Sequence, residues 1–430
     1  MSARSAYPSS VVKGIPRLGR KPDGWREVAF GDVLEVVKRP ATIDPTQSYQ
    51  LINVKRNRGG VIPRETKRGR EIKTKTQFYV AAEDFVISRR QIVHGACGIV
   101  PPELDRALVS NEYSTFVPKN GLCLEFLACF SHTSHFQKTC FHASVGVVIE
   151  KMIFNLDAWL KHRFYLPPLK EQERIVRILA AADRAIARTE NLIDAKGRLK
   201  EGLAERLLTG RCRLLGTKPE KWRHVRLADI ATIIVSGVDK KSKSAEAEIR
   251  LCNYTDIYYK DRIGLDCEFM IATASAAEIE NYSLRKGDVI ITKDSETPDD
   301  IAKPAVVIED MPGVLCGYHL AILRPQKVHG PFLSQLLRLS RIRHEFYRVA
   351  NGVTRYGLGR HAIASLLLKL PSQEEQLRIA AVLGCLDRNV ELLQTKLTAL
   401  REIKRGLMQR LFTDSTSEVR LAGEENRNAS

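Results

Sequence analysis

Two stretches of the chain carry apolar residues at the alternating three- and four-residue spacing of a long amphipathic helix. The first stripe comprises Ile175, Leu179, Ala182, Ile186 and Ile193, and the second comprises Ile379, Leu383, Leu386, Val390, Leu393, Leu397 and Leu400. A Leu-Pro pair precedes each stripe, and proline disfavours a helical conformation in the residue before it. The first pattern predicts one helix over 171–208, ~57 Å long at ~1.5 Å per residue. Such a helix is too long for the core of either globular segment, so it needs a partner.

The two stripes belong to an internal repeat with an offset of 204 residues. Residues 166–175 return as 370–379, and 16 of the 45 positions in 166–210 are identical to their counterparts. At the same offset, 79–89 align with 283–293, and both segments are typical of a turn followed by a strand. Trp25-Arg26 matches Trp222-Arg223 upstream. Each copy therefore opens with a strand after its tryptophan and closes with a long helix.

The repeat predicts the architecture. One stripe can pack against the other as an antiparallel pair, because two matched stripes in one chain meet at high effective concentration. A homodimeric coiled coil is the alternative. The predicted fold class is α+β, with two mixed α/β domains separated by two long antiparallel helices that form a coiled-coil-like spacer. The predicted segments are domains at 1–165 and 215–369, helices at 166–214 and 370–414, and a disordered tail at 415–430. A charge at Leu179 or Leu383 is expected to harm helix assembly rather than the folding of a domain.

Charge and composition point to a polyanionic partner. The formal net charge is +18, and more than half of it falls in residues 1–165, a balance that favours binding to phosphates. Nine cysteines lack the paired spacing of a disulfide framework, which suits a reducing compartment. No apolar run approaches the ~18 residues that span a bilayer. We therefore expect a cytoplasmic protein without a membrane contact.

The repeated motif, with the chain's basic charge and dissimilar globular segments, resembles the specificity (S) subunit of type I restriction-modification enzymes. The most specific parts are 166–183 and 370–387, supported by 286–290 and 351–356. The first copy departs from the pattern, since Glu83 stands where the second copy has Gly287. The resemblance implies two target recognition domains, each reading one half of a bipartite, asymmetric site in double-stranded DNA. The helices would set the spacing and dock methyltransferase subunits, two of them expected.

The same resemblance implies further partners and a division of chemistry. Motor and nuclease (R) subunits would join the methyltransferase (M) core. This chain would bind no cofactor, whereas its partners would use S-adenosylmethionine, ATP and Mg²⁺. The chain itself lacks a Gly-x-x-x-x-Gly-Lys phosphate loop, a Gly-x-Gly-x-x-Gly loop and an Asn-Pro-Pro-aromatic motif. We therefore predict a non-catalytic subunit. The alternatives are a stand-alone nucleic-acid-binding scaffold and a nuclease built around Asp299, Asp300 and Lys303.

Candidate DNA contacts in the first domain are its densest cations. We expect these cations to lie on an exposed loop or ribbon, with glycines between them. Such a loop can follow a phosphate backbone. The cations are Lys55, Arg56, Arg58, Arg64, Lys67, Arg68, Arg70, Lys73 and Lys75. Arg89 and Arg90 follow a predicted strand at 85–88, where side chains emerge at the edge of a sheet. A solvated charged face without a ligand is the alternative for the whole set.

Candidate contacts in the second domain are more varied. Lys240, Lys241 and Lys243 lie in a Ser/Gly-rich loop, and Lys293 is the counterpart of Arg89. Asn253 and Tyr254, with Tyr258 and Tyr259 behind them, offer groups suited to base edges or sugars, unless the tyrosines belong to a core or strand. Arg355 and Tyr356 lie between Gly352 and Gly357, which permit a close approach of the backbone.

One further group resembles a set of metal ligands. The four residues are His132, His135, Cys140 and His142. Their spacing matches none of the common structural zinc patterns, and the surrounding apolar pattern is typical of a helix that packs on a sheet. We therefore predict that no metal binds there.

Overall fold

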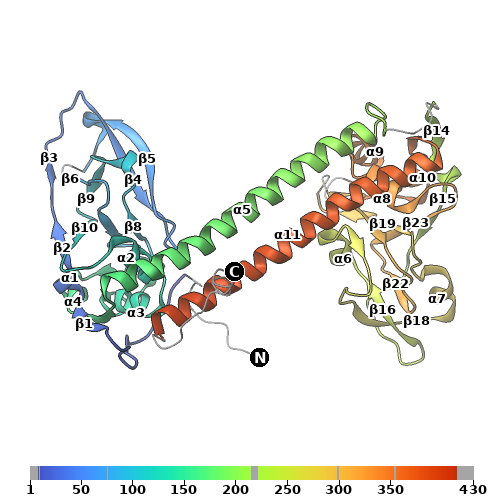
Figure 1. The fold of residues 1–430 in the computed structure, drawn as a ribbon. Coiled ribbons are helices and arrows are strands. Elements are labelled where there is room, and N and C mark those ends of the chain that lie inside the picture. The colour runs from blue at the N-terminus through green and yellow to red at the C-terminus, as the bar shows by residue number, and fades with distance from the viewer. Residues whose placement is uncertain are drawn as a thin grey trace, which may run out of the picture. The chain divides into compact units, whose positions relative to one another are not determined.

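A computed structural model describes residue 8 and residues 10–74, 76–214, 221–297, 300–352 and 355–413. The chain divides into two compact units. The first unit comprises Met1–Arg188 and Leu397–Ser430, and the second comprises Thr189–Lys396. Each unit contains one globular domain and one end of each long helix (Figure 1). Lys75 and the predicted tail at 415–430 lie outside the described residues.

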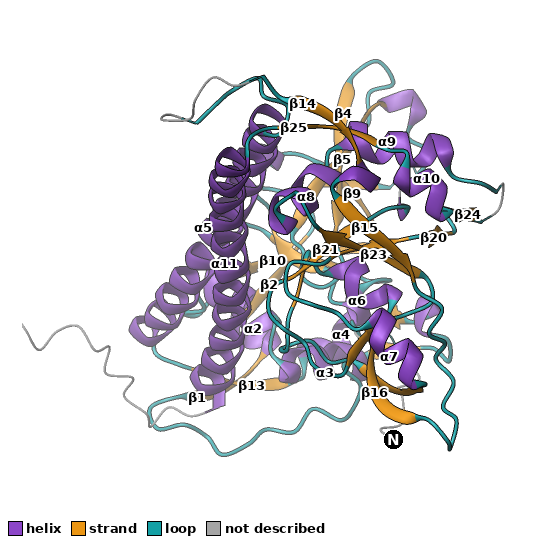
Figure 2. Cartoon of the chain, turned by 90° about the vertical axis from the view of Figure 1, so that its right-hand side faces the viewer, coloured by secondary structure: helices purple, strands orange, loops and turns teal. Residues whose placement is uncertain are grey.

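Both stripes fold into long helices. Helix α5 spans Leu169–Leu207 and helix α11 spans Gln373–Thr413 (Figure 2). The observed start and end of α5 agree closely with the predicted 171–208. Each helix begins just after a Leu-Pro pair, as the backbone preference of a residue before proline requires. No described helix is long and apolar enough to cross a membrane.

The repeat generates the same ion pair in both units. In the first unit the start of α5 lies antiparallel to the end of α11, and Lys404 Nζ lies 2.5 Å from Asp183 Oδ1. In the second unit Lys200 Nζ pairs with Asp387 Oδ1. The two aspartates are 204 residues apart, and so are the two lysines. The pairs therefore occupy equivalent positions and fix the same antiparallel register.

The buried ends of the helices also belong to the domain cores. Leu179 is 1% exposed and packs in the apolar cluster of the first domain, and Leu383 is fully buried in that of the second. Their burial in the domain cores argues against the expectation that a charge at either leucine harms assembly rather than the folding of a domain. The apolar stripe of each helix thus also contributes to a domain core, because the first turns of the helix pack against that domain.

The first domain combines two sheets with a layer of helices. The four-stranded sheet has the order β2 (Leu34–Val37), β10 (Tyr113–Pro118), β7 (Phe85–Ser88) and β8 (Cys97–Ile99). The five-stranded sheet has the order β3 (Pro40–Ala41), β6 (Gln77–Tyr79), β9 (Leu108–Ser110), β4 (Ser48–Val54) and β5 (Val61–Arg68). The helices are α1 (Phe30–Val33), α2 (Leu124–Ser131), α3 (Ser134–His142) and α4 (Leu156–Leu160), and a short ribbon joins β11 (Ser144–Val145) to β12 (Ile153–Phe154). Stacked rings fill the core, with Phe30 4.1 Å from Trp159 between ring centroids.

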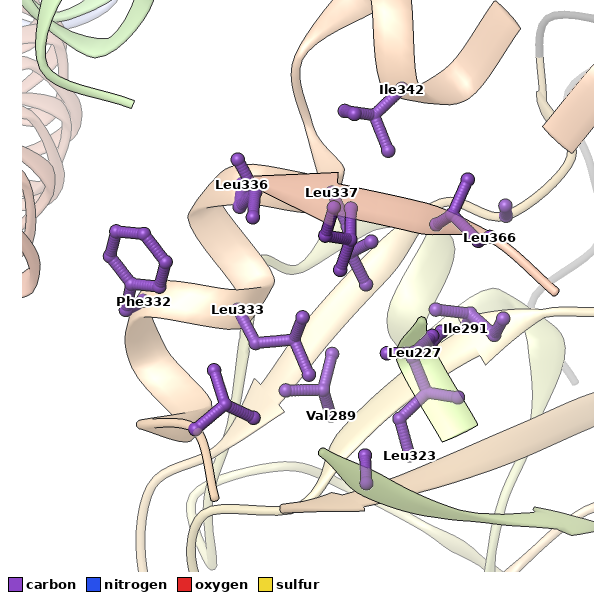
Figure 3. Close-up of a cluster of buried hydrophobic side chains, with 14 of the residues drawn as sticks. Leu227, Val289, Ile291, Leu323, Phe332, Leu333, Leu336, Leu337, Ile342 and Leu366 are labelled. Atoms are coloured by element: carbon purple, nitrogen blue, oxygen red, sulfur yellow. The ribbon is translucent and has the colours of Figure 1, made fainter. Parts of the chain in front are cut away.

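The second domain has a related central sheet and a separate three-stranded one. The central sheet has the order β15 (Ala231–Val235), β23 (Leu320–Pro325), β19 (Val289–Thr292), β21 (Pro304–Val307) and β17 (Arg262–Ile263). The other comprises β18 (Met270–Ala274), β16 (Ala247–Cys252) and β22 (Val314–Cys316), and a ribbon pairs β20 (Asp294–Ser295) with β24 (Tyr356–Gly357). The helices are α6 (Tyr254–Tyr259), α7 (Ala276–Tyr282), α8 (Gly330–Leu337), α9 (Ser340–Val349) and α10 (Arg360–Ala364). Figure 3 shows apolar side chains of α8 packed toward β19 and β23.

In each domain the first strand pairs with the last. Strand β1 (Arg26–Ala29) pairs antiparallel with β13 (Arg163–Leu166), with Arg26 opposite Leu166. Strand β14 (Arg223–Arg226) pairs in the same way with β25 (Leu367–Leu370), with Arg223 opposite Leu370. The predicted opening strands are therefore confirmed. Because β13 and β25 run directly into the prolines before α5 and α11, this pairing fixes each domain to the base of its helix.

Candidate DNA interface

Both domains hold a loop against the end of the central strand through the same main-chain contact. The Arg89 carbonyl, just after β7, accepts a hydrogen bond from the Phe154 N–H at 3.1 Å. The Lys293 carbonyl, just after β19, accepts one from the Leu358 N–H at 2.7 Å. Both donors and both acceptors are 204 residues apart. Each domain thus carries the same frame, formed by the end of the central strand and the loop that precedes α4 or α10.

A buried aspartate braces the start of each central strand. Asp84 accepts hydrogen bonds from the Ala81 N–H at 2.7 Å and from Arg39 at 2.5 and 3.0 Å. Asp288 accepts from the Arg285 N–H at 2.9 Å and from Arg324 at 3.0 and 2.9 Å. The arginine comes from a different point in each copy, which is why the sequence match did not reveal it.

The glutamine of each repeated motif anchors a helix to its domain. Gln172 donates to the Pro167 carbonyl at 3.0 Å and accepts from the Cys123 N–H at 2.7 Å. Gln376 donates to the Pro371 carbonyl at 3.1 Å and accepts from the His329 N–H at 2.9 Å. Cys123 and His329 are the residues that precede α2 and α8. The part of the motif that suggested the family is therefore structural, and its amides are buried.

The basic run of the first domain forms a hairpin. Strands β4 and β5 pair antiparallel, with β5 at the edge of the five-stranded sheet. Arg64 and Lys67 approach Glu65 at 3.2 and 3.1 Å, so this carboxylate offsets part of their charge. Lys55, Arg68, Arg70 and Lys73 are also exposed. The predicted ribbon is present, and Arg64 and Arg68 lie exposed on its edge strand β5.

Two arginines at the tip of this hairpin are engaged by the protein itself. Arg56 donates to Gln91 at 2.8 Å and to Glu150 at 2.7 Å. Arg58 has left-handed backbone (φ 57°), and its guanidinium packs on Gly95. Burial lowers the pKa of Arg58. The expectation of an exposed side chain is wrong for Arg58, because its backbone N–H bonds to the Gly95 carbonyl at 2.7 Å and draws the tip inward.

The arginines after β7 differ in exposure. Arg89 is half-buried and lines a cavity of about 600 Å³ together with Tyr113 and Phe154. Arg90 is exposed and forms two hydrogen bonds with Glu112, at 2.6 and 3.2 Å, which raise the pKa of the guanidinium. Both arginines follow β7 as predicted, but β7 is an inner strand of its sheet rather than an edge strand, and Arg90 alone of the two is exposed.

In the second domain the lysine loop is exposed and partly paired. Lys243 Nζ lies 2.9 Å from Glu246, Lys241 Nζ lies 3.9 Å from Asp239, and Lys240 is exposed. Asn253 precedes α6, and its N–H bonds to Asp256 at 2.7 Å. Tyr254, Tyr258 and Tyr259 lie on this helix rather than in a strand, and none of them is fully buried.

The tyrosines of α6 meet the β20–β24 ribbon at a cavity of about 430 Å³. Its lining includes Tyr254, Tyr258, Glu296 and Arg355. The sequence had selected Tyr254 and Arg355 separately, and the fold brings them together. Glu296 was not among the predicted contacts, because phosphate binding favours cations.

The other residues selected near this ribbon are built into the protein. Lys293 is 9% exposed; its ammonium lies 3.2 Å from Asp294 and 4.4 Å from the centre of the Tyr318 ring. Tyr356 is half-buried, with its ring centroid 5.6 Å from that of Tyr347. Gly352 has φ of 119°, and an added Cβ would lie 1.9 Å from the Arg355 carbonyl oxygen, so this turn requires glycine; the close approach of its backbone to DNA stays a prediction.

The possible metal ligands of the first domain face different neighbours. His135 Nε2 lies 3.0 Å from the Arg163 carbonyl, and His142 Nδ1 lies 3.4 Å from His162. Cys140 is buried in the core, and burial lowers the pKa of His132 to about 4. In the described ranges no group of three or more His, Cys, Asp or Glu residues could hold a metal ion. Asp299 lies outside those ranges.

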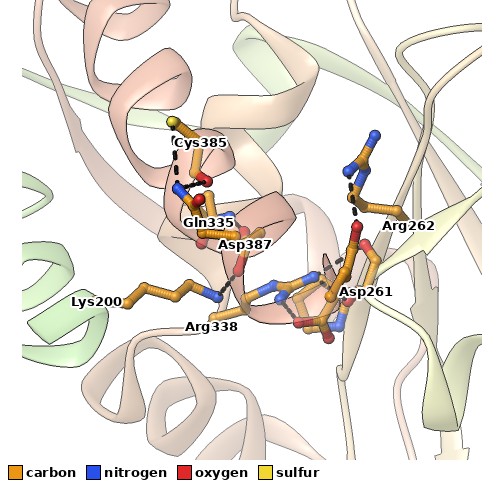
Figure 4. A network of polar contacts seen from close by, with 10 residues as sticks. Lys200, Asp261, Arg262, Gln335, Arg338, Cys385 and Asp387 are labelled. Carbon is orange, nitrogen blue, oxygen red and sulfur yellow. Dashed lines mark hydrogen bonds and ion pairs between the residues drawn. The ribbon is translucent and has the colours of Figure 1, made fainter. Parts of the chain in front are cut away.

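A polar network fastens the helices to the second domain. Asp387 of α11 pairs with Lys200 of α5 and accepts from Gln335 of α8 at 2.7 Å (Figure 4). Arg262 approaches Glu391 at 3.3 Å, and Arg338 pairs with Asp261. The sequence did not predict this network, since its members come from four separate segments of the chain.

A tandem pair of domains with one frame and different surface residues, each joined to a matched helix, defines a two-domain DNA-recognition protein. The profile of the type I restriction modification DNA specificity domain matches residues 22–195 and 219–402. The chain belongs to this family and carries two copies of its domain. The family is the non-catalytic, DNA-recognition component of type I restriction-modification systems.

Relatives match over nearly the full chain. The type I restriction enzyme MjaVIII specificity subunit of Methanocaldococcus jannaschii is 19% identical, covering 92% of this chain and 93% of that protein. The crystal structure of the S subunit from M. genitalium has a TM-score of 0.55 at 14% identity, covering 94% of this chain and 100% of that one. The HsdS subunit from Thermoanaerobacter tengcongensis has a TM-score of 0.50 at 17% identity, covering 92% and 98%. At these identities the structures support the shared fold.

Proposed function

We propose that the two domains of this chain read the two halves of a bipartite, asymmetric DNA site through the frames at the ends of β7 and β19. The observation that carries the proposal is the pair of equivalent main-chain contacts, Phe154 to Arg89 and Leu358 to Lys293. Equal frames with unequal side chains suit a protein that recognises two different short sequences at a fixed separation.

Within this proposal the basic hairpin of the first domain contacts phosphates. Phosphate contacts position a protein on DNA, whereas base contacts specify the sequence. The exposed cations of β5 and the following turn, including Arg64, Arg68 and Arg70, suit the first role. Arg89 and its cavity in the first domain, and Arg355 and Tyr254 in the second, suit the second role. Lys240, Lys241 and Lys243 add positive charge beside the second frame.

The assembly partners belong to the same proposal. Methyltransferase subunits, two of them, dock along α5 and α11, and motor and nuclease subunits complete the enzyme. S-adenosylmethionine, ATP and Mg²⁺ act in those partners. The matched ion pairs of the two units support two docking positions, because the repeat presents the same helix surface twice.

The test is to assay the purified chain with and without its methyltransferase partner. We expect the chain alone to produce neither DNA methylation nor cleavage. With the partner, we expect methylation at one asymmetric, split sequence, mapped by sequencing of the modified DNA. Cleavage by the pure chain in the presence of Mg²⁺ would contradict the proposal and favour the nuclease alternative. Binding without sequence preference in the complex would favour a stand-alone scaffold.

A further inference from the structure

The ribbon of the second domain is flanked by two opposite charges. In this ribbon Asp294 is opposite Gly357 and Ser295 is opposite Tyr356. Glu296 comes directly after Ser295, and Arg355 comes directly before Tyr356, so both adjoin the last pair of the ribbon. Both are exposed, and both line the cavity of about 430 Å³.

The other charged groups around this cavity already have partners. Asp294 Oδ2 lies 3.2 Å from Lys293 Nζ and 3.0 Å from His319 Nδ1. Asp300 accepts from the Thr297 hydroxyl at 2.7 Å, and Lys303 Nζ lies 4.0 Å from the centre of the Tyr258 ring. Within the described ranges, the side chains of Glu296 and Arg355 make no ion pair and no hydrogen bond.

Main-chain hydrogen bonds hold residues on both sides of Arg355. Asn351 and Gly357 exchange two of them, at 2.9 and 2.8 Å. Leu358, next in the chain, bonds to the Lys293 carbonyl. Such flanking contacts reduce the conformational freedom that the chain near Arg355 would lose when this side chain binds a ligand.

We propose that Glu296 and Arg355 together read one G·C base pair in the major groove. The O6 and N7 atoms of guanine are acceptors that match the two-donor fork of arginine, and the N4 amino group of cytosine is a donor that matches a carboxylate. A two-stranded ribbon fits the width of the major groove. The inference rests on the proposed function, and it assigns the base pair that this part of the second domain recognises.

The carboxylate distinguishes base reading from backbone contact. A glutamate beside a phosphate would be repelled, so Glu296 weakens any purely electrostatic grip by Arg355. Beside a G·C pair the same carboxylate accepts a hydrogen bond from the cytosine amino group. No other base pair presents this donor next to the two guanine acceptors. The pair of charges therefore carries sequence information that a cluster of lysines would lack.

The experiment uses the full chain co-expressed with its methyltransferase partner, with methylated sites mapped across a genome. The variants are Glu296→Ala and Arg355→Ala, with Arg355→Lys to keep the charge but remove the fork. Matched controls are Glu280→Ala on α7 and Arg285→Ala, both exposed in the same unit. We expect the wild-type complex to require G·C at one position of one half-site. Each test variant should lose about 5- to 150-fold of the discrimination at that position alone, and the controls none.

The outcomes separate this inference from the function beneath it. A wild-type complex that methylates a split sequence with no required G·C pair in either half would overturn the inference and leave the function standing. Unchanged sites in both alanine variants would do the same. Uniform loss of methylation at all sites would mean that the residues contact phosphates, again against the inference. A wild-type complex without sequence-specific methylation would remove both.

Discussion

Glu83 occupies a backbone position that suits glycine. Its φ is 68°, and its counterpart Gly287 has φ of 87°. Left-handed backbone costs an ordinary L-residue ~1–2 kcal/mol, partly offset because glycine has more freedom to lose on folding. Glu83 and Gly287 therefore adopt the same left-handed turn, but the backbone of Glu83 is more strained.

We predict that Glu83→Gly raises the free energy of unfolding of the first unit by about 0.5–1 kcal/mol. The matched change Gly287→Ala should lower that of the second unit by about 1 kcal/mol, because an added Cβ meets no neighbouring atom and only the backbone is strained. Denaturant titration of each variant measures both. A destabilised Glu83→Gly protein would mean that the carboxylate has a role that the turn does not reveal.

Individual contacts were the least predictable feature of the sequence. The positive charge of the sequence pointed to Arg355, which is exposed, but also to Arg58 and Lys293, which contact other parts of the protein. It gave no indication of Glu296. Burial depends on what the fold brings near a side chain. Arg58 is covered because Gly95, 37 residues later, leaves room for a guanidinium.

The hairpin of β4 and β5 offers a test of phosphate binding. We predict that replacing Arg64, Lys67, Arg68 and Arg70 with alanine weakens DNA binding and lowers the slope of log K against log salt by ~0.9 for each phosphate that the hairpin no longer neutralises. Because Glu65 offsets part of the charge of Arg64 and Lys67, the drop should be less than the sum for four free cations.

The control for the hairpin keeps its charge. With the three arginines changed to lysine, the salt slope should match that of the wild type, since a phosphate contact needs a cation rather than a fork. Equal slopes for the alanine and wild-type proteins would mean that the hairpin is a solvated face.

The long helices allow a test of how far their stripes serve the domains. We predict that Leu179→Asp destabilises the first unit and Leu383→Asp the second by about 3–5 kcal/mol each, because each leaves a charge in an apolar core. Exposed leucines on the same helices, changed as Leu192→Asp and Leu392→Asp, should have effects within about 0.5 kcal/mol. Fluorescence of versions of each protein that keep Trp159 or Trp222 as their single tryptophan follows the two units separately. A stable variant that fails only to bind the methyltransferase would restore the original expectation.

Helices and opening strands were predictable because their signals are local or repeated. The stripe spacing and the Leu-Pro pair determine where α5 begins, and a tryptophan marks each opening strand. The order of strands within each sheet was not predictable. It depends on pairings between distant segments, such as β2 with β10, for which a single sequence offers no register.

The matched ion pairs predict how half of the chain behaves. A chain of residues 1–213 keeps Asp183 and Lys200 but loses the partners of both. In a symmetric pair of two such chains, Asp183 of each copy can meet Lys200 of the other, since these lysines and aspartates are repeat equivalents. We predict that the fragment dimerises and, with the methyltransferase, modifies an inverted repeat of the first half-site.

Light scattering and mapping of methylated sites check this prediction. In the fragment, Asp183→Lys should weaken the dimer, because lysines then face lysines, and adding Lys200→Asp should restore it. A monomeric fragment, or methylation at the original asymmetric site, would show that the two copies are not equivalent modules.

The main-chain fastening of each frame has an evolutionary consequence. Phe154 and Leu358 hold their loops through N–H and carbonyl groups that every residue except proline can supply. Mutations at the exposed residues beside each frame, such as Arg90, Glu296 and Arg355, can therefore alter the surface without dismantling the loop. A lineage carrying such a chain can drift to a new target sequence by single substitutions, while selection for stability acts on the aspartates, glutamines and leucines beneath.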